Sequence, residues 1–258
     1  MQDAKTRVFQ TARNLPKLLL ITTALTATEL IVTIPLDPPE EYRLPLKPAK
    51  EELIDLELIE GIDIWNSDVD GYAVSSDLDQ ALTQFLHKPV RIVVKGPKHR
   101  ETGQDTTYEP LNYEKRGVNY QDFYPMTVAS TSSLIGSQEA IRQAVRSKLD
   151  DIEHLDKKAW TEERIQSVSI ERWRPNIVVD GPLNPFEEDA WEAIEVGKHT
   201  VFCVARAFRC MLHNLEPKTA VRDAAVPWSI LQRFRVMEPE LIPKYCFVRI
   251  PMFDAALF

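Results

Sequence analysis

The first candidate for chemistry is a cysteine that follows two arginines. The segment V-A-R-A-F-R-C (204–210) ends an apolar run and places Cys210 directly after Arg209. Neighbouring cations favour the thiolate form of a cysteine, and a thiolate is both a nucleophile and a soft metal ligand. Cys210 is therefore a candidate for either role. The alternative is a buried cysteine that only fills space, as we predict for Cys203 and Cys246 in their own apolar runs.

A second candidate is a pair of arginines two residues apart. Residues 172–176 read R-W-R-P-N and lead into the apolar run 177–179. In a strand, Arg172 and Arg174 would share a face, where two guanidinium groups can bind a phosphate or an oxo anion. Asn176 adds an amide that can both donate and accept hydrogen bonds. The alternative is an ordinary ion pair with a nearby acid, for which the candidates are Glu187, Glu188 and Asp189.

Composition excludes several common kinds of site. The chain has 258 residues and a net charge of −8, which argues against broad nucleic-acid binding. It has 8 glycines, and the closest pair, Gly96 and Gly103, lies seven residues apart. The sequence therefore contains no glycine-rich dinucleotide-binding motif, no P-loop and no serine-hydrolase nucleophile elbow. Three cysteines form neither a disulfide framework nor a four-thiolate zinc site, and their sparse use suits a reducing compartment.

Periodicity and punctuation predict the elements that position these residues. In the first half we expect paired strands at 17–25 and 29–34, strands over 52–65, a serine-capped helix at 75–86 and a strand at 90–95. The polar stretch 96–119 lacks periodicity and predicts a long loop at a domain junction. In the second half we expect a strand at 126–129, a helix at 138–149 and a solvated charged segment at 150–167. Buried strands should follow at 177–179 and 200–205. A short helix should begin after Pro227, with Ile230, Leu231 and Phe234 facing inward.

These segments together resemble the MOSC family, named after the C-terminal domain of molybdenum cofactor sulfurase. The resemblance rests on R-W-R-P-N-I-V-V-D-G (172–181), P-F-E-E-D-A-W (185–191), I-E-V-G (194–197), V-A-R-A-F-R-C (204–210), N-L-E-P-K-T (214–219), V-R-D (221–223) and P-W-S-I-L (227–231). Upstream, T-A-R-N-L-P-K-L-L-L-I (11–21) and Y-Q-D-F-Y-P-M (120–126) resemble the N-terminal β-barrel domain that accompanies MOSC and its junction. The motifs are most similar to those of fungal members and of the mitochondrial amidoxime-reducing component.

The resemblance implies a molybdenum–molybdopterin cofactor and assigns residues to it. Cys210 would be the protein ligand to the metal and the catalytic residue. Arg174 and Asn176 would bind the pterin phosphate or nearby polar groups. The remaining implied cofactor contacts are Phe208, Arg209, Asp122, Phe123 and Tyr124.

The resemblance also implies an α+β fold that is mainly β. A β-barrel-like N-terminal domain would cover residues 1–118, and a MOSC β-barrel domain with a few short helices would cover residues 119–258. Relatives usually begin with a strand carrying a Lys-Ser pair and a D-R-x-W-like strand, which this sequence lacks. The expectation is therefore an N-terminal domain truncated at its start.

The implied function is a molybdenum-dependent oxidoreductase that reduces N-oxygenated small molecules, with a haem or flavin protein as electron donor. Two alternatives stay open: a non-catalytic carrier of cofactor or sulfur, and a truncated inactive relative. Sulfurase-type members carry a separate pyridoxal-phosphate domain, for which this chain has no room. We expect no nucleic-acid partner. The apolar run 18–25 is too short and too polar to span a membrane. The cytoplasm and the mitochondrion both remain open as locations.

Overall fold

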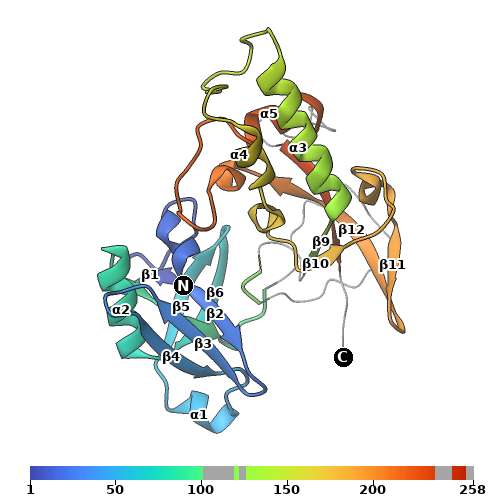
Figure 1. The fold of residues 1–258 in the computed structure, drawn as a ribbon. Coiled ribbons are helices and arrows are strands. Elements are labelled where there is room, and N and C mark those ends of the chain that lie inside the picture. The colour runs from blue at the N-terminus through green and yellow to red at the C-terminus, as the bar shows by residue number, and fades with distance from the viewer. Residues whose placement is uncertain (101–118, 122–125, 236–245, 254–258) are drawn as a thin grey trace. The chain divides into compact units, whose positions relative to one another are not determined.

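The computed structural model describes residues 1–100, 119–121, 126–235 and 246–253, without side-chain detail for 204–209 and 246–253 (Figure 1). The chain divides into two compact units. Of the described residues, the first unit holds 1–100, 119–121 and 217–220, and the second holds 126–216, 221–235 and 246–253. The domain boundary at 118/119 stays a prediction, because it falls beside residues that the structure does not describe.

The first unit contains three small antiparallel sheets. Their orders are β2-β3-β4, β5-β6-β8 and β1-β7. The strands are β1 (Gln2–Asp3), β2 (Thr22–Leu25), β3 (Glu29–Ile34), β4 (Glu40–Pro45), β5 (Leu58–Ile64), β6 (Ser67–Ala73), β7 (Val90–Arg91) and β8 (Val93–Lys95). The predicted pairing of the second and third strands is confirmed, with Thr23 opposite Val32. Two details differ: Pro16–Leu20 is a 3-10 helix (η1), and Lys50–Ile54 is a short helix, α1, where a strand was expected.

Helix α2 (Ser76–Leu86) confirms the capped helix predicted in the first unit. Ser75 is the N-cap, and its side chain accepts a hydrogen bond from the Leu78 amide at 3.2 Å. The apolar stripe of the helix, represented by Leu78 and Leu82, is buried in one cluster with Ile34 of β3. The 3.6-residue spacing of that stripe is the reason the sequence alone predicts this element.

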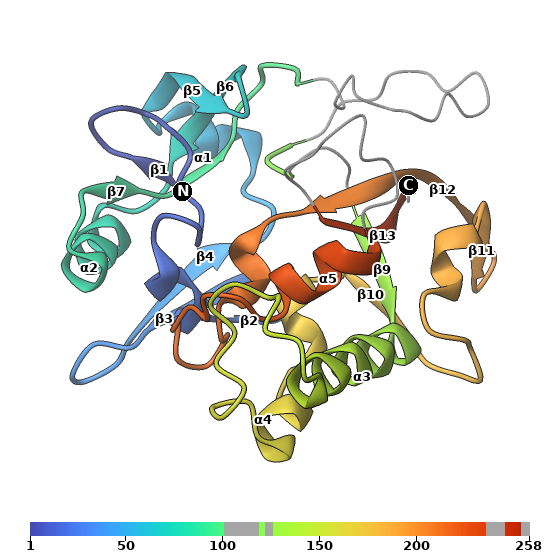
Figure 2. The ribbon, with the colours of Figure 1, turned by 90° about the horizontal axis from the view of Figure 1, so that it is seen from above.

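The second unit is built on one five-stranded sheet. Its order is β10-β9-β13-β12-β11, with β10 parallel to β9 and the other pairs antiparallel. The strands are β9 (Met126–Ser130), β10 (Ile177–Val179), β11 (Ala193–Val196), β12 (His199–Arg209) and β13 (Cys246–Phe253). The α-helices are α3 (Thr131–Arg146), α4 (Glu162–Gln166) and α5 (Trp228–Arg235), and α3 contacts both of the others (Figure 1, Figure 2).

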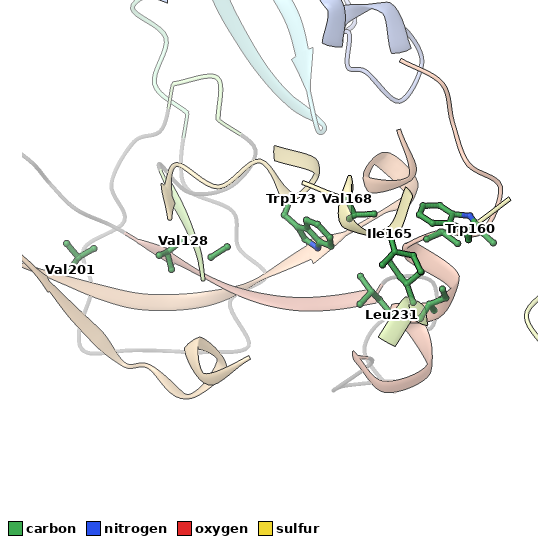
Figure 3. Packing of buried hydrophobic residues seen from close by; sticks show 12 residues of the cluster. Val128, Trp160, Ile165, Val168, Trp173, Val201 and Leu231 are labelled. Atoms are coloured by element: carbon green, nitrogen blue, oxygen red, sulfur yellow. The ribbon is translucent and has the colours of Figure 1, made fainter. Parts of the chain in front are cut away.

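The main core of the second unit lies between the sheet and these helices. Val128 of β9, Leu231 of α5 and the indole of Trp173 share one buried cluster (Figure 3). Trp160 and Ile165 belong to the same cluster and are each 2% exposed. The expectation of a solvated segment at 150–167 is therefore wrong for its second half, because two large apolar side chains anchor a charged surface stretch.

Other expectations for the second unit differ in detail. The helix predicted at 138–149 ends at Arg146 and begins already at Thr131. Its early start follows from Ser130, whose side chain caps the helix by accepting from the Ser133 amide. Strand β10 packs on the core through one face, that of Ile177 and Val179, so Val178 on the other face is exposed rather than buried. Ile230 and Leu231 face inward as predicted, whereas Phe234 is 46% exposed.

The molecule is thus mixed and mainly made of strands, as expected. The predicted β-barrels are not confirmed, because the strand pairings among the described residues form open sheets. Within the described ranges, no helix has the length and apolar character that crossing a membrane requires.

Candidate functional site

Cys210 lies where a long strand gives way to a 3-10 helix. Strand β12 ends at Arg209, and Cys210 caps the 3-10 helix η4 (Met211–Asn214) with extended backbone. It is a free, half-buried cysteine. Cys203, by contrast, packs against the main core. The space-filling role therefore fits Cys203, and Cys210 remains the candidate nucleophile or metal ligand.

A second 3-10 helix, η2 (Ile170–Trp173), packs against η4. The Trp173 indole stacks on the His213 ring, with centroids 5.9 Å apart and an interplanar angle of 21°. Both side chains are buried. The stack fixes the segment that ends at Trp173 against the segment that begins after Cys210. Arg174 and Cys210 are the capping residues of this packed pair.

The prediction that Arg172 and Arg174 share a face is wrong. Arg172 is buried, its side chain being 4% exposed, and it forms an ion pair with Glu216. Its Nη1 also donates to the His213 carbonyl oxygen at 3.2 Å. The cause is the local conformation, because a 3-10 helix has three residues per turn and residues i and i+2 point in different directions. Burial lowers the pKa of Arg172, and the Glu216 carboxylate opposes that shift.

The acids first considered as arginine partners have other roles. Glu188 is buried and accepts from the Ser130 hydroxyl at 3.0 Å. Asp189 pairs with Arg235 of α5 at 2.6 Å. Arg172 does form an ion pair, but its partner is Glu216, 44 residues further along the chain, and not an acid at 187–189.

Arg174 is exposed, in contrast to Arg172. Its backbone is left-handed, with φ 52° and ψ 45°, and its carbonyl oxygen accepts from the Thr127 hydroxyl at 3.3 Å. Among the described residues, none forms an ion pair or hydrogen bond with its guanidinium group. The side chain is therefore available to an anion.

Asn176 is fixed by its backbone and by half of its side chain. Its N–H donates to the Thr127 carbonyl oxygen at 2.9 Å, and its Oδ1 accepts from the Thr127 N–H at 2.9 Å. No described residue accepts a hydrogen bond from its Nδ2. The free side of the amide is therefore a donor, which suits an anionic ligand.

Sequence reasoning gave no role to Arg222, although it lies in the quoted V-R-D motif. Its Nη1 donates to the Met211 carbonyl oxygen at 3.1 Å, one residue after Cys210. An antiparallel bridge between Leu215 and Arg222 and a 2.8 Å bond from the Asp223 N–H to the Asn214 carbonyl oxygen hold it there. Only the fold reveals this contact, because the two residues are eleven positions apart without a repeating pattern.

Asp223 joins the base of this loop to the helical layer. One carboxylate oxygen accepts from the amides of Ala225 and Val226 at 2.9 and 2.8 Å. The other accepts from the Trp160 indole N–H at 3.0 Å and from Arg164 Nη2 at 2.9 Å. A carboxylate that accepts four donors stabilises the segment that follows Arg222.

Five implied contact residues stay predictions. Asp122, Phe123 and Tyr124 lie outside the described residues. Phe208 and Arg209 lie on β12 opposite Phe247 and Cys246, and only their backbone positions are described. Within the described ranges, no three His, Cys, Asp or Glu side chains gather as a metal site.

Comparison with known proteins gives this site a context. Residues 131–236 match the model of the MOSC domain. The chain is 28% identical over 238 residues to mitochondrial amidoxime reducing component 2 of Rattus norvegicus, covering 91% of this chain and 61% of that protein. It is 26% identical over 232 residues to mitochondrial amidoxime-reducing component 1 of Danio rerio, covering 89% and 61%. Component 2 of Homo sapiens is 26% identical over 230 residues, covering 89% and 59%. The chain thus spans about three fifths of the length of these relatives.

Proposed function

Because this chain contains a MOSC domain and is a homologue of the mitochondrial amidoxime-reducing components, we propose that it binds molybdenum–molybdopterin and reduces N-oxygenated small molecules. The observation that carries the proposal is that η2 and η4 pack together, with the exposed Arg174 as the C-cap of η2 and the free, half-buried Cys210 as the N-cap of η4. Asn176 follows two residues after Arg174.

The chemistry of the donor set fits this cofactor. The Cys210 sulfur is a soft ligand and, as a thiolate, would hold the metal of the cofactor. The Arg174 guanidinium and the Asn176 NH₂ group are donors without described partners, and they match a phosphate. A phosphate held in this way needs no glycine loop, in keeping with the sparse glycines of the sequence.

The bound cofactor supplies two-electron oxygen-atom transfer, while the protein supplies binding, orientation and electrostatics. Cys210 holds the metal, and Arg174 neutralises anionic charge on the cofactor. Arg209, Phe208 and the Asp122–Tyr124 segment complete the proposed contacts. The names of the relatives support an amidoxime-like substrate and a mitochondrial location. A haem or flavin protein is the proposed electron donor, because reduction of an N-oxygenated compound consumes two electrons.

The barrel description and the two domains at 1–118 and 119–258 belong to the same proposal. The MOSC match at 131–236 lies inside the second of these domains and supports it.

A second candidate function uses the same sulfur atom. Cys210 has no disulfide partner and is half-buried, so it could carry a persulfide as a non-catalytic sulfur or cofactor carrier. The intact mass of the chain separates the two functions, because a persulfide adds one sulfur atom at Cys210 and leaves the metal content at background.

The decisive experiment compares Cys210→Ala with Cys203→Ala in a host that makes molybdenum cofactor. We expect the parent and the Cys203→Ala chain to retain molybdenum and pterin fluorescence, and the Cys210→Ala chain to lose both. Cys203 is the matched control because it lies in β12, seven residues before Cys210, with its side chain against the core. Equal molybdenum content in the Cys210→Ala and parent chains would overturn the assignment.

A further inference from the structure

Thr127 makes an unusual set of contacts with Arg174 and Asn176, the two proposed anion-binding residues. It lies in β9, where its partner in the neighbouring strand β13 is Met252, so its backbone is held within the sheet. Toward the other side, its N–H and carbonyl groups bind Asn176 at 2.9 Å each. Its hydroxyl lies 3.3 Å from both the Arg174 carbonyl oxygen and Asn176 Oδ1. One residue thus contacts the backbone of Arg174 and both the backbone and the side chain of Asn176.

These contacts decide which atoms of Asn176 face a ligand. A backbone N–H can only donate, so the side-chain atom of Asn176 beside the Thr127 nitrogen must be the amide oxygen. The NH₂ group is then directed away from Thr127. A reversed amide would place two donors against each other and would present an acceptor to the ligand. The orientation set by Thr127 therefore makes Asn176 selective for an anion.

The hydroxyl adds a contact that the backbone cannot supply. A hydroxyl has one hydrogen, so Oγ1 donates to the Arg174 carbonyl oxygen or to Asn176 Oδ1 at any one time. The first bond restrains the left-handed turn at Arg174, a conformation in which a residue with a Cβ atom is uncommon. The second reinforces the amide orientation.

From this geometry we propose that Thr127 is a positioning residue for the anion-binding segment formed by Arg174 and Asn176. It acts through these two residues and touches no ligand itself. This inference rests on the proposed function for its ligand, the phosphate of the pterin cofactor. The arrangement of the amide can be measured without that cofactor.

The test compares Thr127→Val, which keeps the β-branched shape and removes the hydroxyl, with Thr127→Ser, which keeps the hydroxyl. Thr131→Val is the matched control, because the Thr131 hydroxyl donates to Asp180 at 2.6 Å near the opposite ends of the same two strands. Every variant keeps the backbone N–H of residue 127, so the comparison isolates the contribution of the hydroxyl. In each metal-free chain, nuclear magnetic resonance follows the Asn176 NH₂ pair and the Arg174 amide during titration with inorganic phosphate.

We expect Thr127→Val to shift both signals and to weaken phosphate binding about 2- to 10-fold, the effect of one lost hydrogen bond. Thr127→Ser and Thr131→Val should keep the parent affinity, and thermal unfolding should show all four chains folded. Unchanged Asn176 and Arg174 signals in Thr127→Val would overturn the positioning role, even if phosphate binding fell. Shifted signals with unchanged phosphate affinity would overturn it as well.

Failure of the proposed function gives a different result. A parent chain that binds neither phosphate nor molybdopterin contradicts the function. The comparison of the Asn176 signals between Thr127→Val and Thr127→Ser still decides whether the Thr127 hydroxyl restrains the amide. If the parent binds phosphate, molybdenum content after expression in a cofactor-producing host should follow the same order as phosphate affinity among the four chains.

Discussion

The interior of the η2–η4 pair differs sharply from its two ends. In the interior, Arg172, Trp173 and His213 are buried, and the charge of Arg172 is matched by Glu216. At the ends, Arg174 is exposed and Cys210 is half-buried, and neither side chain has a described partner. Two arginines two positions apart therefore have opposite roles. A guanidinium group can serve a ligand only where the fold has not already used it.

The largest expected effect comes from removing the charge in the interior. Arg172→Met should lower the free energy of unfolding by about 3 kcal/mol, because Glu216 loses its ion-pair partner and the Arg172 hydrogen bond to the His213 carbonyl disappears. Denaturant unfolding measures the change. The double variant Arg172→Met, Glu216→Gln should recover part of the loss, because no lone carboxylate remains. A double variant less stable than Arg172→Met would contradict the pairing as the cause.

An intermediate effect is expected at the base of the Arg222 loop. Asp223→Asn keeps one oxygen for the amides of Ala225 and Val226 but replaces the oxygen that accepts from Trp160 and Arg164. Unfolding should become easier by about 1–3 kcal/mol, the usual range for a buried donor left unpaired.

The control for this change is Asp180→Asn, where the carboxylate accepts from an exposed threonine hydroxyl. It should shift the unfolding free energy by less than about 0.5 kcal/mol. Equal losses in the two variants would mean that Asp223 is no more important to the fold than a surface acid.

The smallest effect on stability is expected at Arg174. Arg174→Ala keeps a Cβ atom in the same left-handed backbone, so the unfolding free energy should change by less than about 0.5 kcal/mol. Molybdopterin content should nevertheless fall about 10-fold or more, because a charged hydrogen-bond donor to the phosphate is lost. Pterin fluorescence and metal analysis, read beside the unfolding curve, test both halves. A destabilised Arg174→Ala variant, or one with full cofactor content, would contradict the division of roles between a structural Arg172 and a ligand-binding Arg174.

Local patterns determined the elements that have their own signals. The spacing of Leu78 and Leu82 and the serine before them specify α2 without any distant contact. The order of motifs from 172 to 231 specifies the MOSC domain, which the family match at 131–236 confirms. Cys210 was also identifiable from its neighbours in sequence, although its role as a metal ligand stays a proposal.

Distant contacts decided the rest. The sequence around 172–174 offers two equivalent guanidinium groups, and the choice between them depends on Glu216 and His213, which the fold brings from about 40 residues away. Trp160 becomes a core residue within a charged stretch because it packs in the apolar cluster of the second unit, where Asp223 accepts its N–H. The contacts of Thr127 with Asn176 and of Arg222 with the Met211 carbonyl exist only in the folded chain. Residue types and hydrophobic periodicity can be recognised within a short segment of sequence. The hydrogen-bond and ion-pair partners of buried polar groups cannot, because the fold brings them from distant segments.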